Sequence, residues 1–212
     1  MSWSEEDHVR HFMYESIFKV LSTRPWPEHR SVLDFAGKFY GDPDGGWQTH
    51  MRTMCKTLFS RNMYYIGATW PEETIENLSY QAESFDLSIA DQILEHVERP
   101  WVAAAELERV TKKGGVCVVA TPGLYPIHPS PLDCWRIMPD GYRVLFPESR
   151  WDYLDLSMWG NADRVGFEYS SNQAFPYGPP ETSVQQAMQQ PFYTPGSDGR
   201  CPIQIWWIGV KR

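Results

Sequence analysis

Two short apolar segments, separated by a helical pattern, most strongly constrain the fold of this chain. Residues 85–90 read FDLSIA, and residues 116–121 read VCVVAT. Between them, Ala103, Leu107 and Val110 recur at helical spacing. Strands that are apolar along nearly their whole length and alternate with helices indicate a parallel sheet covered on both faces. The chain is therefore predicted to be an α/β protein with a doubly wound, Rossmann-like sheet.

Similar patterns predict the remaining elements. Apolar runs predict strands at residues 31–36, 63–67 and 203–210, with a further strand at 164–171. Helical spacing and capping residues predict helices over residues 5–21, along 47–58, from Pro100 to a cap at Gly114, and over 140–145. The sequence thus predicts a mostly parallel sheet with helices on both faces and an antiparallel last strand.

The length of 212 residues suits one domain with a substantial core. We expect residues 1–212 to form a single domain that opens with an N-terminal helical extension, residues 1–30. Residues 122–150 are rich in proline and are expected to form the region that binds substrate. Residues 178–200, rich in Pro, Gln and Gly, are expected to be an irregular insert before the last strand.

The charge of the chain narrows the choice of partners. The formal net charge is -8 and the pI is about 5.2, without a basic cluster. Such a chain lacks the electrostatic footprint of a protein that binds nucleic acid or an anionic membrane. A small-molecule substrate is the expected ligand, and assembly with a second copy or another protein stays open. No run approaches the roughly 20 apolar residues of a membrane helix.

The cysteines indicate the redox environment. The four cysteines are scattered and form no CxxC pair: Cys55, Cys117, Cys134 and Cys201. Their spacing argues against a zinc site and against a disulfide framework, so no metal is predicted. Free cysteines fit the reducing cytoplasm.

The segment after the first predicted strand reads VLDFAGKFYG and begins like a nucleotide-binding turn. Asp34 ends the strand, and Ala36 and Gly37 open the turn. Such turns are usually rich in glycine, because the backbone must come close to the bound cofactor. Here Lys38 and Tyr40 occupy positions where small residues are expected, and their side chains obstruct that approach.

Residues 85–146 resemble the class I S-adenosylmethionine (SAM)-dependent methyltransferases, in particular those of type 11. The shared features are a strand beginning FDL, the motif LEHV before a helix, a Lys-x-Gly-Gly turn and a strand ending in Thr-Pro. The later pattern HPSPLDCWRIMPDGYR is similar to a branch that acts on sugars or other small hydroxylated metabolites. The resemblance implies SAM as the cofactor and O-methylation of such an acceptor.

The resemblance also implies a set of cofactor-binding positions. They are Asp34, Ala36, Gly37, Thr69, Glu83, Ala90, Asp91 and Gln92. Ala36, Lys38 and Tyr40 stand where the family usually has glycines. Thr69 stands where the family has an acidic residue that grips both ribose hydroxyls, a task for which one hydroxyl is a poorer acceptor. Asp91 is equally well explained as a helix cap.

The proline-rich loop carries the residues expected to act on the acceptor. His128 is the candidate general base, because its reference pKa is near neutral, and Asp133 is expected to orient it. Arg136 is suited to bind a substrate carboxylate or phosphate with two hydrogen bonds. Tyr125 and Trp135 complete the predicted substrate site. Alternatively, Asp133 and Arg136 pair to hold the loop in shape, with Trp135 in the core.

Two functions therefore compete on the sequence alone. The first is a SAM-dependent methyltransferase, favoured by Asp34, LEHV and the loop that contains His128. The second is a methyltransferase-like protein that has lost SAM binding and serves as a partner subunit or in a SAM-independent reaction. Lys38 and Thr69 favour the second. A nicotinamide dehydrogenase is disfavoured, since no full GxGxxG follows the first strand and no acid closes the second.

Overall fold

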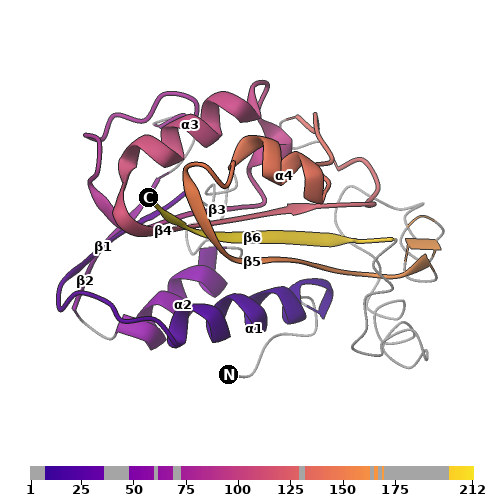
Figure 1. The fold of residues 1–212 in the computed structure, drawn as a ribbon. Coiled ribbons are helices and arrows are strands. Elements are labelled where there is room, and N and C mark those ends of the chain that lie inside the picture. The colour runs from indigo at the N-terminus through magenta and orange to yellow at the C-terminus, as the bar shows by residue number, and fades with distance from the viewer. Residues whose placement is uncertain are drawn as a thin grey trace.

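A six-stranded sheet organises the chain (Figure 1). The computed structural model describes residues 8–35, 48–59, 62–68, 73–128, 132–162, 165–166, 169 and 201–212. The strands are β1 (Arg30–Asp34), β2 (Met63–Gly67), β3 (Phe85–Asp91), β4 (Thr111–Pro122), β5 (Trp151–Trp159) and β6 (Gln204–Lys211). They lie in the order β2-β1-β3-β4-β6-β5. The irregular insert predicted at residues 178–200 lies outside the described residues.

The direction of the strands agrees with the expectation from sequence. β1 pairs in parallel with β2 and β3, and β3 pairs in parallel with β4. β6 runs antiparallel to both of its neighbours, β4 and β5. The predicted doubly wound, mostly parallel sheet with an antiparallel last strand is confirmed.

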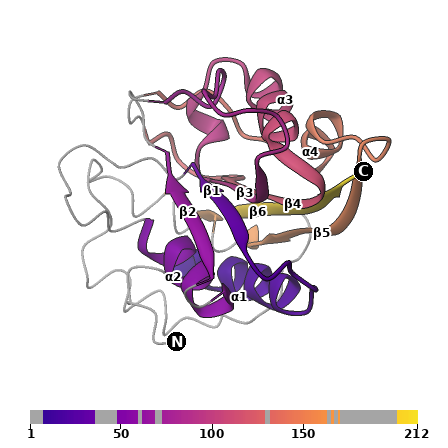
Figure 2. The same cartoon turned by 90° about the vertical axis from the view of Figure 1, so that its left-hand side faces the viewer.

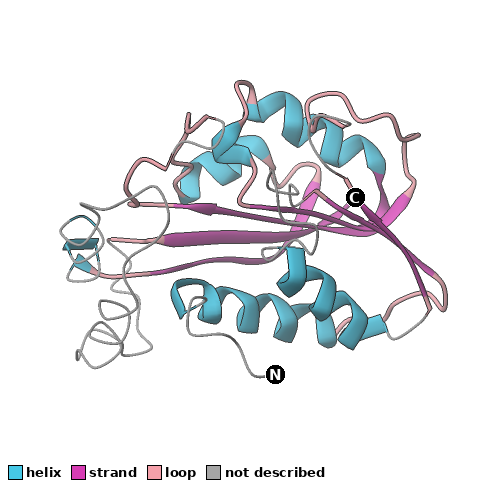
Figure 3. Cartoon of the chain, turned by 180° about the vertical axis from the view of Figure 1, so that it is seen from behind, coloured by secondary structure: helices cyan, strands magenta, loops and turns pink. Residues whose placement is uncertain are grey.

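Helices cover both faces of the sheet, as predicted. α1 (His8–Ser22) and α2 (Gln48–Phe59) pack on one face, while α3 (Pro100–Val110) and α4 (Pro139–Leu145) pack on the other (Figures 1 and 2). Figure 3 shows the same three layers from behind. Each face has its own cluster of buried apolar side chains. No helix in the described part of the chain has the length and apolar character needed to cross a membrane.

Two sequence predictions about the last third of the chain were wrong. Residues 165, 166 and 169, which fall in the strand predicted at 164–171, are helical, and the other residues of that segment are outside the described ranges. The strand before β6 is β5, which the sequence analysis did not predict. β5 reads WDYLDLSMW, and most of its side chains are only partly buried at the edge of the sheet. It therefore lacks the continuous apolar run that marks the central strands.

The predicted end of α3 was also wrong. α3 ends at Val110, and the backbone N–H of Thr111 donates to the carbonyl of Leu107. The chain turns directly into β4, so Gly114 belongs to this strand and does not cap the helix. The φ of Gly114 is 73°, at a point where the pairing of β4 with β3 shifts in register. Glycine is suited to this left-handed conformation because it has no Cβ.

A carboxylate joins three strands at the amino edge of the sheet. Asp86 accepts hydrogen bonds from the backbone N–H and the hydroxyl of Ser31, at 2.8 and 2.7 Å, and from Lys112 Nζ at 2.9 Å. Burial by itself raises the pKa of Asp86, but the hydrogen bonds from Ser31 and Lys112 outweigh it, so the pKa lies below its usual value. The charged form of Asp86 is therefore the form that stabilises the fold.

We expect Asp86→Asn to reduce the free energy of unfolding at pH 7 by about 1.5–3 kcal/mol, the range for hydrogen bonds to charged groups. Because the folded pKa of Asp86 is lowered, its contribution is present above the unfolded pKa. It is lost as pH falls through the folded pKa. Urea unfolding of both proteins at several pH values would measure the difference. A gap that stays constant down to pH 2 would contradict a role for the charge.

Candidate functional site at the carboxyl edge of the sheet

The carboxyl ends of the parallel strands meet at one edge of the sheet, where ligands bind in proteins of this architecture. Asp34 is the last residue of β1 and is 1% exposed. Its carboxylate accepts a hydrogen bond from the Tyr65 hydroxyl, and its carbonyl accepts one from the N–H of Ala68 at 3.0 Å. Asp34 is thus tied to the end of β2. The predicted cofactor positions Ala36, Gly37 and Thr69 lie outside the described residues.

Asp91 ends β3 and meets two helices that the sequence analysis did not associate with the site. The hydroxyl of Tyr14, on α1, donates to Asp91 Oδ2 at 2.8 Å, and both residues are buried. The Tyr14 ring stacks on His50, on α2, with 5.1 Å between centroids. Burial raises the pKa of Asp91, while the nearby charge of Arg10 and the Tyr14 hydroxyl oppose that rise. Asp91 does not cap a regular helix here.

The neighbours of Asp91 connect β3 to the rest of the edge. Ala90 is fully buried within β3, opposite Val119 of β4. Gln92 has a φ of 57°, and its Nε2 donates to Oε1 of Gln204 at 3.0 Å. Gln92 is therefore held in a left-handed conformation that points its amide toward the start of β6. The predicted positions Ala90, Asp91 and Gln92 are together at the carboxyl edge.

Glu83 is a correction to the predicted cofactor site. It precedes β3 and so lies at the amino edge, opposite Asp34 and Asp91. Its backbone N–H donates to the carbonyl of Arg109 at 2.8 Å, and its carboxylate lies 3.6 Å from Lys211 Nζ. The sequence analysis misplaced Glu83 because residues 73–84 contain no regular helix or strand from which an edge could be assigned.

The loop after β4 is held by an ion pair. Arg136 and Asp133 form two hydrogen bonds, one of them 2.6 Å long from Nη2 to Oδ2. The other guanidinium hydrogens donate to the carbonyls of Tyr125, Pro126 and Trp135. All five N–H donors of a guanidinium are thereby used within the protein. Arg136 shapes the loop, as the alternative interpretation proposed, and keeps no donor for a substrate carboxylate or phosphate.

Asp133 connects this ion pair to His128. Its Oδ2 accepts a hydrogen bond from the backbone N–H of His128 at 2.8 Å and lies 3.3 Å from His128 Nδ1. Burial opposes ionisation of Asp133, but the hydrogen bonds from Arg136 and His128 lower its pKa to about 2. Burial lowers the pKa of His128, so the imidazole is neutral at pH 7. A neutral ring has a lone pair available for a proton or a metal ion.

The two predicted aromatic substrate residues differ in position. The Tyr125 ring meets the His128 ring edge-on, with 5.6 Å between centroids. Trp135 is 38% exposed, so it is not in the core. Its indole N–H donates to the carbonyl of Val97 at 2.8 Å, and its ring contacts Trp101. Tyr125 therefore lies beside the candidate base, and the described contacts of Trp135 are elsewhere.

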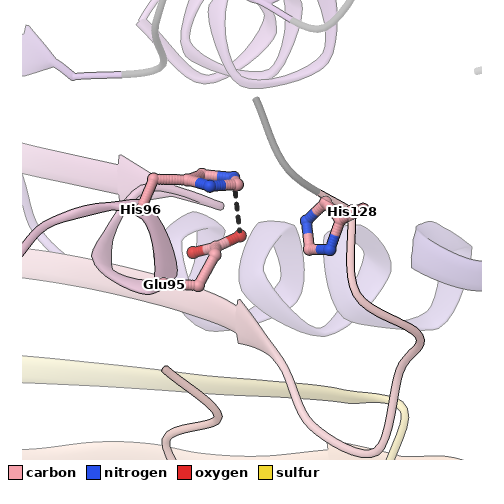
Figure 4. Close-up of side chains that lie close together, drawn as sticks. All are labelled: Glu95, His96 and His128. Atoms are coloured by element: carbon pink, nitrogen blue, oxygen red, sulfur yellow. Dashed lines mark ion pairs between the residues drawn. The ribbon is translucent and has the colours of Figure 1, made fainter. Parts of the chain in front are cut away.

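The motif LEHV lies next to His128. Leu94–His96 form a short 3-10 helix, η2, just beyond β3. Glu95, His96 and His128 come together so that one ligand atom from each lies within 4.8 Å of the other two (Figure 4). The rings of His96 and His128 meet edge-to-face at 5.2 Å. Burial raises the pKa of Glu95 to about 8 and lowers the pKa of His96.

Sequence reasoning missed two parts of this site. Arg10 and Tyr14 are spaced i, i+4 on α1, on the face that also carries the buried Met13 and Ile17. A polar pair beside an apolar helix face was a usable signal, but residues 1–30 were treated as an extension. Glu95 was not singled out, because nothing local in LEHV indicates that a distant histidine will face it.

The fold and the residues at the carboxyl edge of the sheet together indicate a class of protein. An open, doubly wound sheet with buried carboxylates and imidazoles at its carboxyl edge is suited to bind a small cofactor and an acceptor side by side. The titratable groups that gather there include Arg10, Tyr14, Asp34, Asp91, Glu95, His96, His128 and Asp133. This arrangement fits a group-transfer enzyme.

Comparison with known proteins agrees with that class. Residues 48–119 match the family model described as methyltransferase domain. The match begins after the altered loop and runs from α2 into β4. No curated protein sequence matches the chain. Solved structures do match it, and several of them are described as methyltransferases.

Three of these structures illustrate the similarity. A chain from the complex of the Haloferax volcanii Trm112 methyltransferase activator with a methyltransferase has a TM-score of 0.55 and 13% identity, over 96% of this chain and 90% of that one. Geranyl diphosphate C-methyltransferase from Streptomyces coelicolor, bound to Mg²⁺, geranyl diphosphate and S-adenosylhomocysteine, gives 0.52 and 12%, over 95% and 77%. A methyltransferase from Bacillus halodurans gives 0.50 and 14%, over 93% and 97%.

Residues 48–119 thus carry the match to a methyltransferase domain, and the fold is shared with solved structures that include an S-adenosylmethionine-dependent methyltransferase.

Proposed function

We propose that the protein transfers the methyl group of SAM to a hydroxyl of a small metabolite or sugar. The observation that carries this proposal is the position of His128. The loop after β4 carries it at the carboxyl edge, beside Glu95 of the LEHV segment. In this proposal, the region 122–150 receives the acceptor, and the ends of β1 and β3 receive the cofactor.

The cofactor side of the proposal uses the residues at those strand ends. Asp34 orders the turn that follows β1, and Ala36 and Gly37 contact the cofactor through their backbone. We assign the ribose to Thr69. The methionine part of SAM is bound by Asp91 and Gln92. The Tyr14 hydroxyl holds Asp91 in place through a hydrogen bond of 2.8 Å.

The acceptor side of the proposal uses three residues: His128, Asp133 and Tyr125. In methyl transfer, the acceptor oxygen attacks the methyl carbon, the carbon–sulfur bond breaks, and S-adenosylhomocysteine leaves. The hydroxyl proton must be taken up as the new bond forms. We assign its removal to His128 as the general base, with Asp133 as the residue that orients the ring at 3.3 Å. Tyr125 lies beside the acceptor.

A second function is favoured by the residues of the turn after β1. Lys38 and Tyr40 replace glycines there, and Thr69 replaces the ribose-binding acid. These changes support a methyltransferase-like subunit that does not bind SAM and acts with a protein partner. The Haloferax volcanii structure pairs a methyltransferase with an activator protein, which is one form that such a partnership takes.

Calorimetric titration with SAM and with S-adenosylhomocysteine separates the two functions. We expect either ligand to bind in the micromolar range, because Asp34, Asp91 and Gln92 remain at the strand ends. Released S-adenosylhomocysteine, measured over a panel of hydroxylated metabolites, would then identify the acceptor. A folded protein that binds neither ligand at millimolar concentration would overturn the methyltransferase proposal and favour the partner subunit.

A further inference from the structure

Three side chains beside the acceptor region have the composition of a metal site. Glu95, His96 and His128 each offer one ligand atom, and these atoms lie within 4.8 Å of one another (Figure 4). The cluster combines one carboxylate with two imidazoles. This is the mixture of ligands that holds Zn²⁺ and similar first-row metals at sites that keep open positions.

Of the three side chains, Glu95 is the one that most needs a further interaction. Its side chain is 0% exposed, and neither carboxylate oxygen has a hydrogen-bond partner among the described residues. Figure 4 shows the carboxylate directed between the two imidazole rings. Burying a carboxylate without a hydrogen bond or a cation is costly. A bound divalent ion would supply the missing interaction.

The two histidines are already oriented by other acceptors. His96 Nδ1 is hydrogen-bonded to the carbonyl of Leu132, and its Nε2 lies 3.7 Å from Glu95 Oε1. His128 Nδ1 lies 3.3 Å from Asp133 Oδ2. Histidines that bind metals usually have one ring nitrogen fixed by a carbonyl or a carboxylate in this way. His96 and His128 are therefore each oriented in this way without a bound ion.

The backbone holds the two contributing segments together. The carbonyl of Glu95 accepts hydrogen bonds from the N–H groups of Cys134 and Trp135, at 2.7 and 3.2 Å. The Trp135 indole donates to Val97 on the same segment. η2 and the loop that carries His128 and Asp133 are thus fastened to each other. A metal would find its ligands in place, with little ordering cost.

We propose that Glu95, His96 and His128 form a binding site for a divalent transition-metal ion of the Zn²⁺ or Co²⁺ class. Three protein ligands leave coordination positions open. The proposed use of an open position is to bind the oxygen of the methyl acceptor, and this use alone rests on the proposed function. When the ion is bound, His128 acts as a ligand and not as the base, the ion lowers the pKa of the acceptor hydroxyl so that its proton can pass to water, and Asp133 positions the His128 ring.

The test is to titrate metal-free protein with Co²⁺, following visible absorption, and with Zn²⁺ by calorimetry. We expect one ion to bind per chain, with ligand-field bands that Zn²⁺ abolishes by competition. Mg²⁺ is expected to bind more weakly, because two of the three ligands are nitrogen. Glu95→Gln and His128→Gln should each weaken Co²⁺ binding by about tenfold or more. His29→Ala, which alters an exposed histidine, should leave it unchanged.

Circular dichroism and thermal melting check that the variants fold. Without metal, Glu95→Gln should be at least as stable as the parent, because it removes an ionisable carboxyl from a buried position where its oxygens have no hydrogen-bond partner among the described residues. Zn²⁺ should raise the melting temperature of the parent and not that of Glu95→Gln. Absence of bands and heat at millimolar metal would overturn the site. So would full Co²⁺ affinity in both variants. Because these readouts need neither SAM nor turnover, they stand apart from the methyltransferase test.

Discussion

We expect His128→Ala to lower the rate of methyl transfer by about 100-fold or more and to leave the affinity for SAM nearly unchanged. General acid–base groups contribute about 10²–10⁴-fold, and a lost metal ligand would act on the same step. The proposed cofactor residues Asp34, Asp91 and Gln92 lie at other points of the edge, so SAM should still bind. Turnover is measured from released S-adenosylhomocysteine, and affinity by calorimetry.

The matched control is His29→Ala, since His29 is exposed and lies just before β1, at the amino edge of the sheet, away from the carboxyl ends of the strands. It should retain parental turnover. An active His128→Ala enzyme would show that the acceptor proton leaves by another route. A variant that loses SAM binding as strongly as turnover would place His128 on the cofactor side of the site.

The largest expected effect on stability comes from Trp207. Its side chain is fully buried in β6, stacks on Phe146 at 4.3 Å, and meets the edges of Trp151 and Tyr153 at 5.1 and 5.6 Å. We expect Trp207→Ala to cost about 3–5 kcal/mol of unfolding free energy, the range for large aromatic residues in a core. That is a large part of the roughly 5–15 kcal/mol that stabilises a typical domain.

Urea unfolding followed by far-UV circular dichroism would measure this loss without relying on tryptophan fluorescence. Trp101→Ala is the control, because Trp101 is 55% exposed on α3 and should cost no more than about 0.5 kcal/mol. Equal costs for Trp101→Ala and Trp207→Ala would contradict the packing described for β6. Gly209 adds to that packing, since a Cβ at this position would collide with the Trp207 ring.

The central strands could be predicted from the sequence because burial on both faces leaves an uninterrupted apolar run, as in FDLSIA and VCVVAT. The edge strand β5 could not, because its partly exposed face admits Asp152 and Asp155. The end of α3 was misread for a related reason. Lys112 and Gly114 look like a helix terminus, but tertiary contacts draw them into β4, where Lys112 reaches Asp86.

The sequence indicated those site residues that lie near the ends of predicted strands, and it did not indicate the contacts between distant segments. Asp34, Asp91 and His128 each follow a predicted strand, so the carboxyl edge was within reach. The contact between Tyr14 and Asp91 joins α1 to β3. The polar pair Arg10 and Tyr14 marks α1 as unusual, but no pattern in either segment identifies Asp91 as the partner of Tyr14. No local pattern indicates that Glu95 and His128 lie close together either. Arg136 was misjudged because its residue type suggests anion binding, whereas its donors are all used by the loop.

The position of β6 affects the order in which the sheet can be built. Among the described strands, β5 pairs only with β6, and β6 is inserted between β5 and β4. During synthesis, β5 therefore emerges before β6, the strand with which it pairs. Until β6 emerges, the edge of β4 that pairs with β6 is also unpaired. Unpaired strand edges are where chains associate wrongly. The slow and vulnerable stage of biogenesis should be the interval before residues 204–211 arrive, a natural point for a chaperone to act.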